Sequence, residues 1–150
     1  IYDSQSQQVL FTEQFRIGSY PESGPLLECV AGMIDEGECP KKAACRETFE
    51  ETGLSIEENS LINVGTFMLS PGVLCEQTTI FLVDTDLSNV DTHKIHGEVE
   101  ENEAITLKLY SYEDATALFP LDAPANPIVP MMARNLWLMR LNNDQSTSHC

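Results

Sequence analysis

Residues 32–54, GMIDEGECPKKAACRETFEETGL, decide how the rest of the sequence is interpreted. Glu50 and Glu51 follow Glu47 by three and four residues, the spacings that place side chains on one face of a helix. Like charges placed so closely repel each other and cost stability unless a cation lies between them. Because Mg²⁺ and Mn²⁺ prefer oxygen ligands, the pattern predicts a site for a divalent ion.

The same stretch contains the signals of a helix. Pro40 suits the first helical turn, where its missing N–H is harmless, and Gly53 suits the C-terminal cap. We expect this helix to bury Ala43, Ala44 and Phe49.

The composition limits the class of protein. A chain of 150 residues with 42% hydrophobic residues can form one domain with a core, so residues 1–150 are interpreted as one domain. Eight Lys and Arg against 24 Asp and Glu give a net charge of -16, whereas nucleic acids and anionic membranes favour basic surfaces. We therefore expect neither as a partner. No apolar run reaches the ~18 residues that a membrane-spanning helix needs.

The cysteines indicate a reducing compartment. Their number, five, is odd and they show no CxxC pairing, so neither a disulfide framework nor a zinc site is expected. Reduced thiols are typical of a cytoplasmic protein.

Strands and helices are expected to alternate along the chain. Alternating or β-branched residues predict strands at 9–16, 26–31, 61–69, 78–84 and 104–110. Residues 17–25, with two glycines and two prolines, predict a loop, and the acidic residues 86–102 predict a mobile one. The result is an α/β or α+β sandwich of three layers with a mixed sheet.

Two further helices are predicted in the C-terminal third. Ser111 can cap a short helix, with Glu113 and Asp114 favourable in its first turn. Asn126 and Pro127 can start the last helix, and residues 142–150 are expected to fray. Its apolar residues are interpreted as core, namely Ile128, Met131, Met132, Leu136, Trp137 and Met139.

The central stretch resembles the signature of the Nudix hydrolases, Gx5Ex7REUxEExGU, where U is a bulky apolar residue. The fixed positions are occupied by Gly32, Glu38, Arg46, Glu47, Glu50, Glu51, Gly53 and Leu54. Thr48 departs from the pattern because it stands where an aliphatic residue is usual, which weakens the packing of that helix face. The resemblance implies a Nudix α/β/α sandwich.

The resemblance also implies separate roles for the signature residues. Glu47 and Glu51 would bind the metal, and Glu50 would complete the cluster or bind a further ion. Arg46 would pair with one of these carboxylates and orient it for the metal. Gly32 would allow a sharp turn that exposes the carbonyl of Ala31 as another metal ligand.

Flanking segments resemble the ADP-ribose pyrophosphatase branch of this family. They are EQFRIGSY, LLECVAGMIDEGE, SPG and IHGEVEENE, beginning at residues 13, 26, 70 and 95. By this resemblance Arg16, Met33 and Glu76 bind the substrate. Glu101 would be the catalytic base, and Glu103 a further metal ligand. His96 lies in the same loop, and we expect a structural role for it.

The branch implies an Mg²⁺-dependent enzyme, with Mn²⁺ as an alternative ion, that converts ADP-ribose to AMP and ribose 5-phosphate. Glu38 would tie the loop to the helix. The branch also implies a cytoplasmic homodimer with an N-terminal sheet exchanged between subunits, and most of that dimerisation segment is expected to lie outside the present chain.

Three alternatives stay open. A related Nudix hydrolase of another nucleoside diphosphate sugar, such as GDP-mannose, shares nearly all these motifs. A non-catalytic Nudix module would bind nucleotide as a sensor, although the intact glutamates of the signature argue against it. An acidic metal buffer would bind ions without nucleotide affinity.

Overall fold

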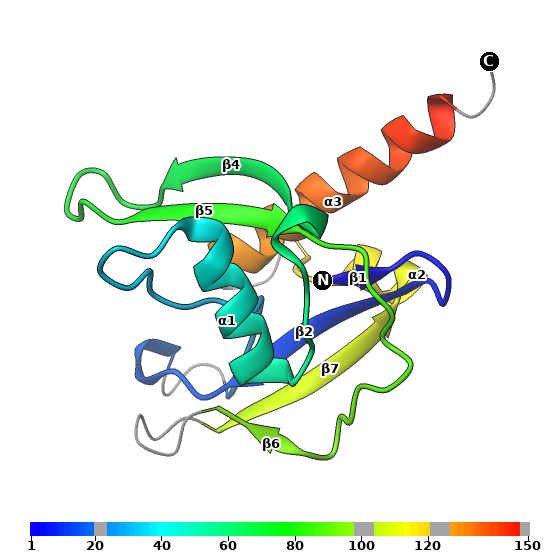
Figure 1. Cartoon of the computed structure of the whole chain (residues 1–150), viewed down its shortest axis with the longest axis horizontal. Helices are drawn as coiled ribbons and strands as arrows, with labels where there is room; N and C mark the ends of the chain where they lie inside the picture. The colour runs from blue at the N-terminus through cyan, green and yellow to red at the C-terminus, as the bar shows by residue number, and fades with distance from the viewer. Residues whose placement is uncertain (20–23, 98–103, 121–126, 148–150) are drawn as a thin grey trace.

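The computed structural model describes residues 1–19, 24–97, 104–120 and 127–147, without the side chains of residues 142–147. Strand β2 (Gln8–Gln14) is the centre of the larger sheet because it has partners along both edges (Figure 1). Strands β1 (Tyr2–Asp3) and β3 (Leu26–Glu28) pair with one edge, and β7 (Ile105–Ser111) pairs with the other. Strand β6 (Ile95–His96) continues the sheet beyond β7, and all these pairs are antiparallel. The strand expected at residues 26–31 is therefore shorter, ending at Glu28.

A smaller sheet contains β4 (Ile62–Met68) and β5 (Gln77–Leu82), which form an antiparallel pair with a bulge before Gly65. A parallel bridge joins Tyr2 in β1 to Asp84, just past β5. Its backbone bonds run from the Tyr2 N–H to the Val83 carbonyl at 3.0 Å and from the Thr85 N–H to the Tyr2 carbonyl at 2.9 Å. Parallel and antiparallel pairing therefore both occur, as the predicted mixed sheet requires, but the parallel part is one bridge among the described residues.

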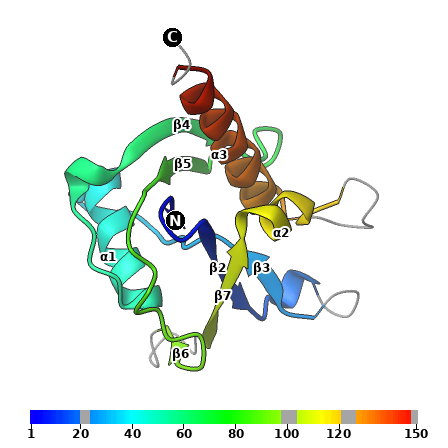
Figure 2. The same cartoon turned by 90° about the vertical axis from the view of Figure 1, so that its right-hand side faces the viewer.

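The helices lie on both sides of the strands. Helix α1 (Pro40–Thr52) covers one side, and α2 (Tyr112–Ala117) with the start of α3 (Ile128–Thr147) covers the other (Figure 2). Short 3₁₀ turns, η1 (Ile17–Ser19) and η2 (Glu58–Ser60), follow β2 and precede β4. The predicted α+β sandwich of three layers is confirmed.

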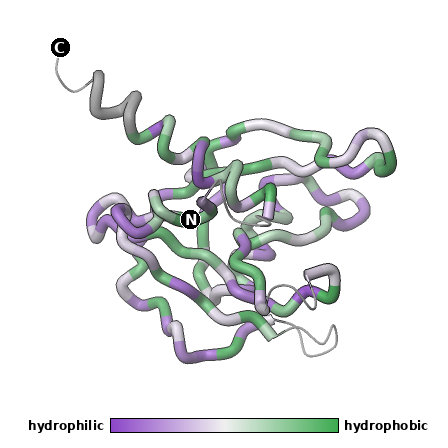
Figure 3. Tube along the Cα trace, turned by 180° about the vertical axis from the view of Figure 1, so that it is seen from behind, coloured by the Kyte–Doolittle hydropathy of each residue, from purple (hydrophilic) through white to green (hydrophobic). Residues whose placement is uncertain are grey.

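Successive residues of β2 point to opposite faces of the sheet, so this strand contributes side chains to both parts of the core. Val9 and Phe11 are buried on the side of Trp137, while Leu10 is buried with Ile105 and Leu107 on the other side. Figure 3 shows the hydrophobic stretches along these central strands from behind. The part of the chain that the structure describes contains no helix long and apolar enough to cross a membrane.

The helix ends follow the sequence signals. Gly53 has φ 76, in the left-handed region, and its N–H donates to the Phe49 carbonyl at 2.8 Å. The Ser111 side chain accepts a 3.0 Å hydrogen bond from the Asp114 N–H. The predicted start and end of α1 and start of α2 are confirmed, whereas the predicted cap Asn126 lies outside the described residues.

The buried face of α1 differs from the expected one. Ala43 is buried, but Phe49 is 58% exposed, and the other buried residues are Thr48, Glu51 and Thr52. The Thr48 hydroxyl donates to the Ala44 carbonyl at 2.6 Å, which satisfies this polar group inside the protein. The expectation for Phe49 was wrong because the helix turns a polar face, not an aromatic one, towards the sheet.

Helix α3 also differs in part. Trp137 is buried at 3% exposure, but Ile128 and Met139 are exposed. The helix continues to Thr147, so the expected fraying from residue 142 was wrong for residues 142–147. The region expected to be a mobile loop contains strand β6, so the expectation was wrong for Ile95 and His96. Residues 86–94 have the turns and irregular backbone of a loop, with Leu87 fully buried among them.

Candidate active site

The guanidinium of Arg46 is the centre of the carboxylate cluster on α1. Its Nη1 donates to Glu47 Oε1 at 2.8 Å and to Glu50 Oε2 at 3.0 Å. Its Nε and Nη2 bind both oxygens of Glu38, at 3.3 and 3.0 Å. The repulsion between the helix carboxylates is thus offset by a cation of the chain itself.

These contacts connect α1 to the loop that precedes it. Arg46 Nη2 also donates to the Met33 carbonyl at 2.9 Å, and the Asp35 N–H donates to Glu38 Oε2 at 3.2 Å. The hydrogen bonds from Arg46 lower the pKa of the Glu38 carboxyl, and the same bonds raise the pKa of Arg46. The predicted roles of Arg46 as an orienting partner and of Glu38 as a tie between loop and helix agree with these contacts.

Gly32 lies directly against the carboxylate of Glu47. A Cβ atom at position 32 would overlap the Cδ and both carboxylate oxygens of Glu47. The φ angle of Gly32 does not lie in the left-handed region, so a glycine is required here by the close approach of Glu47 and not by backbone conformation. The backbone at Gly32 forms neither a turn nor a bend, so the expected sharp turn was wrong, and Gly32 instead leaves room for the Glu47 carboxylate.

The third helix carboxylate is inside the protein. Glu51 is 5% exposed, whereas the side chains of Glu47 and Glu50 are 16% and 29% exposed. Keeping a carboxylate at such a position is costly unless charged or polar groups compensate it. Glu47, Glu50 and Glu51 offer carboxylate oxygens from one helix face, and Mg²⁺ prefers oxygen ligands.

The described residues do not by themselves form a metal centre. Within residues 1–19, 24–97, 104–120 and 127–147, no three acidic, imidazole or thiol side chains are arranged so that they could hold one metal ion. Arg46 instead binds Glu47 and Glu50 through its Nη1. Glu101 and Glu103, the predicted base and further ligand, lie outside the described residues.

The remaining predicted site residues lie outside α1, on the segment before it, after β2 and before β5. Ala31, Met33 and Glu76 are exposed, with Met33 at 85%. Arg16 follows β2, and its Nε donates to Glu28 Oε2 at 2.9 Å. Glu28 is a contact that the sequence interpretation missed, because its signal is the pairing of β3 with β2 and not a motif.

A buried histidine of β6 lies next to the C-terminal cap of α1. His96 is 9% exposed, and its Cε1 would lie 3.7 Å from a Cβ at Gly53, the cap of α1. Burial lowers its pKa, as does Lys94, while Asp91 acts in the opposite direction. A buried imidazole against the helix cap agrees with the structural role expected for it.

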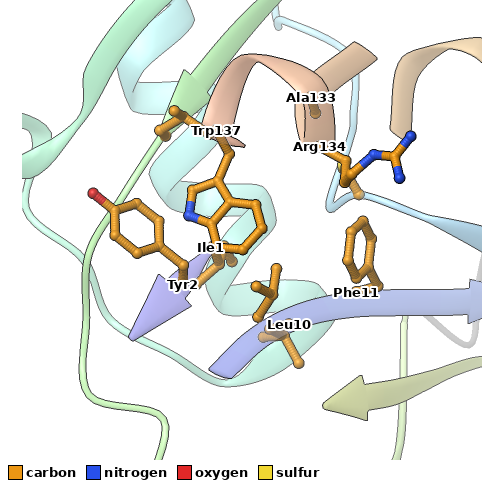
Figure 4. A pocket seen from close by; sticks show the side chains of 10 residues that line it. Ile1, Tyr2, Leu10, Phe11, Ala133, Arg134 and Trp137 are labelled. Atoms are coloured by element: carbon orange, nitrogen blue, oxygen red, sulfur yellow. The ribbon is translucent and has the colours of Figure 1, made fainter. Parts of the chain in front are cut away.

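A small apolar cavity lies elsewhere in the molecule. It has a volume of about 20 Å³ and is lined by residues of β1, β2 and α3, among them Tyr2, Phe11 and Trp137 (Figure 4). It belongs to the core between the sheet and α3, and its lining includes none of the carboxylates of α1, so it is not the site of the carboxylates.

The arrangement of glycine, arginine and carboxylates around α1 agrees with a comparison with known families. The NUDIX domain model matches residues 1–132. The chain belongs to the Nudix family.

Relatives within this family share much of the chain. The ADP-ribose pyrophosphatase of Escherichia coli is 38% identical over 116 residues, 76% of this chain and 54% of that protein. The ADP-ribose pyrophosphatase of Haemophilus influenzae is 37% identical over 119 residues, 76% of this chain and 53% of that protein. The GDP-mannose pyrophosphatase of Pectobacterium atrosepticum is 31% identical over 121 residues, 79% of this chain and 60% of that protein. The chain thus spans about half the length of these ADP-ribose pyrophosphatases.

A solved structure supports the fold. It comes from work on MutT from Aliivibrio salmonicida and Vibrio cholerae, and it matches with a TM-score of 0.55 at 19% identity, covering 90% of this chain and 92% of that one. At this identity the likeness shows the Nudix fold alone.

Proposed function

We propose that this Nudix protein is a pyrophosphohydrolase that cleaves ADP-ribose to AMP and ribose 5-phosphate. The observation that carries the proposal is the close contact between the Glu47 carboxylate and Gly32. This contact brings the loop that contains Ala31 next to helix α1, which carries the glutamates. The similarity to ADP-ribose pyrophosphatases over three quarters of the chain supports ADP-ribose as the substrate.

Mg²⁺, or Mn²⁺ in its place, is the proposed cofactor. Glu47, Glu50, Glu51, Glu103 and the Ala31 carbonyl would hold it. When bound, the metal ions would offset the charge of the diphosphate and lower the pKa of a bound water. Arg46 would keep Glu47 and Glu50 oriented through its 2.8 and 3.0 Å hydrogen bonds.

The chemical step is the attack of water on one phosphorus of the diphosphate. A new P–O bond forms to the water oxygen, and the P–O bond to the bridging oxygen breaks. Glu101 is the proposed base that accepts the water proton. Arg16, Met33 and Glu76 are proposed to bind the rest of the substrate.

A substrate panel tests this proposal. The protein is incubated with Mg²⁺ and either ADP-ribose or GDP-mannose, and released nucleoside monophosphate is measured. We expect AMP release from ADP-ribose to be the faster reaction, and its loss when a chelator removes Mg²⁺. Faster cleavage of GDP-mannose would instead support the second candidate, which the Pectobacterium relative favours.

Two other outcomes would reject hydrolysis. Binding of ADP-ribose without cleavage in the presence of Mg²⁺ would indicate a non-catalytic sensor module. Binding of Mg²⁺ without nucleotide affinity would indicate an acidic metal buffer.

A further inference from the structure

The pair Arg16–Glu28 joins the ends of two strands of the larger sheet. Glu28 is the last residue of β3 and lies opposite Thr12 of β2, whose hydroxyl donates to the Glu28 carbonyl at 3.3 Å. Arg16 is the second residue after β2, and its Nε donates to Glu28 Oε2 at 2.9 Å. Glu28 is therefore fixed by the sheet, whereas Arg16 depends on Glu28 for its position.

The pair lies on the side of the sheet that α1 covers. Residues opposite each other in an antiparallel pair point to the same face, so the side chain of Glu28 shares a face with Thr12. Thr12 in turn shares a face with Leu10, two residues earlier. Leu10 packs in the cluster that Leu54 joins directly after α1, so Glu28 lies on the side of the carboxylate helix.

The hydrogen bond to Glu28 uses only one part of the guanidinium. Arg16 is 44% exposed in its side chain, and among the described residues its Nη1 and Nη2 donate no hydrogen bond. A planar guanidinium held at Nε presents its remaining N–H donors in a fixed direction. Arg16 is thus arranged to bind something beyond the chain itself.

The distance along the chain places this pair within reach of a substrate at the carboxylates. Glu28 precedes Ala31 by three residues, which span at most about 11 Å when fully extended. Gly32, the next residue, touches Glu47. A diphosphate seated at α1 could therefore present its nucleoside part to Arg16.

We propose that Glu28 is a positioning residue that orients Arg16 for the nucleoside part of the substrate. The inference rests on the proposed function. Because the carboxylate of Glu28 offsets the charge of Arg16, the pair suits an uncharged planar or hydroxyl-rich group better than a phosphate. The pair acts on binding and lies away from the bond that breaks, so it should set KM and not kcat.

The neighbouring pair Lys108–Glu13 is a matched control. It joins β7 to β2 at 3.1 Å, with side-chain exposures of 40% and 32%, against 44% and 22% for Arg16 and Glu28. Exposed ion pairs of this kind contribute little to stability. A purely structural role would give both pairs the same small effect.

The experiment measures steady-state hydrolysis of ADP-ribose with Mg²⁺. We expect Glu28→Ala to raise KM about tenfold, the value of one hydrogen bond to a charged group, with kcat changed less than about twofold. Glu28→Asp should recover part of the affinity. Glu13→Ala should leave KM, kcat and the melting temperature near those of the unmodified protein.

A double variant shows whether Glu28 acts through Arg16. In an Arg16→Ala background, Glu28→Ala should raise KM no further, because Glu28 acts through Arg16. An unchanged KM in Glu28→Ala, or full additivity of the two changes, would overturn this inference while the proposed hydrolysis stands.

Failure of the proposed function gives a different result. If the unmodified protein binds ADP-ribose but does not cleave it, hydrolysis is rejected and the same variants are compared by their Kd, where an unchanged Kd for Glu28→Ala overturns the inference. If the unmodified protein does not bind ADP-ribose at all, both proposals fall.

Discussion

Helices α1 and α3 both cover the strands, but they bury opposite kinds of surface. The buried residues of α1 are Ala43, Thr48, Glu51 and Thr52. Helix α3 instead buries Trp137, whose ring lies edge-on to Tyr112 at 4.8 Å between centroids and tilted against Tyr2 at 6.3 Å.

This difference suggests that one helix serves function and the other serves stability. An apolar face such as that of α3 gains free energy from burial, whereas a buried carboxylate on α1 costs free energy that the rest of the protein must offset. Helix α1 is thus held by contacts that position it, including the Lys41 amine, which donates to the Glu58 and Leu61 carbonyls at 2.9 and 3.3 Å. We infer that α1 carries the chemistry and α3 the stability.

The largest effect is expected from the buried carboxylate of α1. Glu51→Gln keeps the shape of the side chain but removes its charge, so it should lower kcat for ADP-ribose by at least ~100-fold. Circular dichroism should show an unchanged fold. Release of AMP with Mg²⁺ measures the activity.

The exposed residue Glu57 offers the control for this change. Glu57→Gln makes the same chemical change just beyond α1, and we expect kcat to stay within about twofold of the unmodified value. Near-normal activity of Glu51→Gln would contradict the assignment of chemistry to α1.

The second effect is expected on α3 and on stability. Trp137→Ala removes a side chain that is 3% exposed, so the free energy of unfolding should fall by about 3–5 kcal/mol. Urea denaturation measures this loss, and kcat of the folded fraction should not change. Met139→Ala, at a position that is 63% exposed on the same helix, should change stability by less than ~0.5 kcal/mol.

A Trp137→Ala protein that keeps its stability but loses kcat would reverse the proposed division between the two helices.

The sequence was sufficient for the order of the longer elements, because strong local signals mark them, but it did not indicate the two-residue strands β1 and β6. Pro40 and Gly53 bound α1, Ser111 caps α2, and the alternation around Val9–Leu10–Phe11 assigns two faces to β2. It was not sufficient for which faces are buried. Phe49 is a large apolar residue of the kind that usually lies in a core. It is exposed here because α1 turns its polar face inward.

The candidate site was predictable in its residues but not in its contacts. The spacing places Glu47, Glu50 and Glu51 on one helix, α1, whereas the sharing of Arg46 among Glu38, Glu47 and Glu50 depends on how the preceding loop folds back. The contact of Gly32 with Glu47 and the pair Arg16–Glu28 likewise join segments that are distant in sequence. Local patterns carry no signal for such long-range register.

A third, smaller effect is expected from the contact between Gly32 and Glu47. In Gly32→Ala the new methyl group would overlap the Glu47 carboxylate, so either the loop or the side chain must move. A misplacement of about 1 Å can cost ~100-fold in rate, and we expect kcat to fall by roughly 10- to 100-fold. Steady-state AMP release checks this change.

Gly24→Ala is the matched control for Gly32→Ala, because no atom lies within 4 Å of a Cβ there and its φ angle is ordinary. It should leave kcat unchanged. Equal loss of activity in both variants would indicate a general effect of loop rigidity and not a contact with Glu47.

The smallest effect is expected at low pH, and it concerns strand β1 of the larger sheet. Asp3 of β1 accepts hydrogen bonds from the backbone N–H groups of Gln5, Ser6 and Leu87 at 2.8, 3.1 and 3.2 Å. Hydrogen bonding to Ser6, followed by these other donors, lowers the pKa of Asp3 from 3.8 to about 2. The carboxylate therefore ties β1 to the segment that contains Leu87.

The sign of the pH dependence follows from this lowered pKa. The stabilisation is fully present above the unfolded pKa of 3.8 and is lost as the pH falls towards the folded pKa of about 2. In urea denaturation between pH 5 and pH 2, the difference in stability between the unmodified protein and Asp3→Asn should be largest near pH 5 and shrink below about pH 4. The kcat of Asp3→Asn at neutral pH should stay normal, because Asp3 belongs to the scaffold. A difference in stability that does not depend on pH would show that the hydrogen bonds, and not the charge, hold β1 in place.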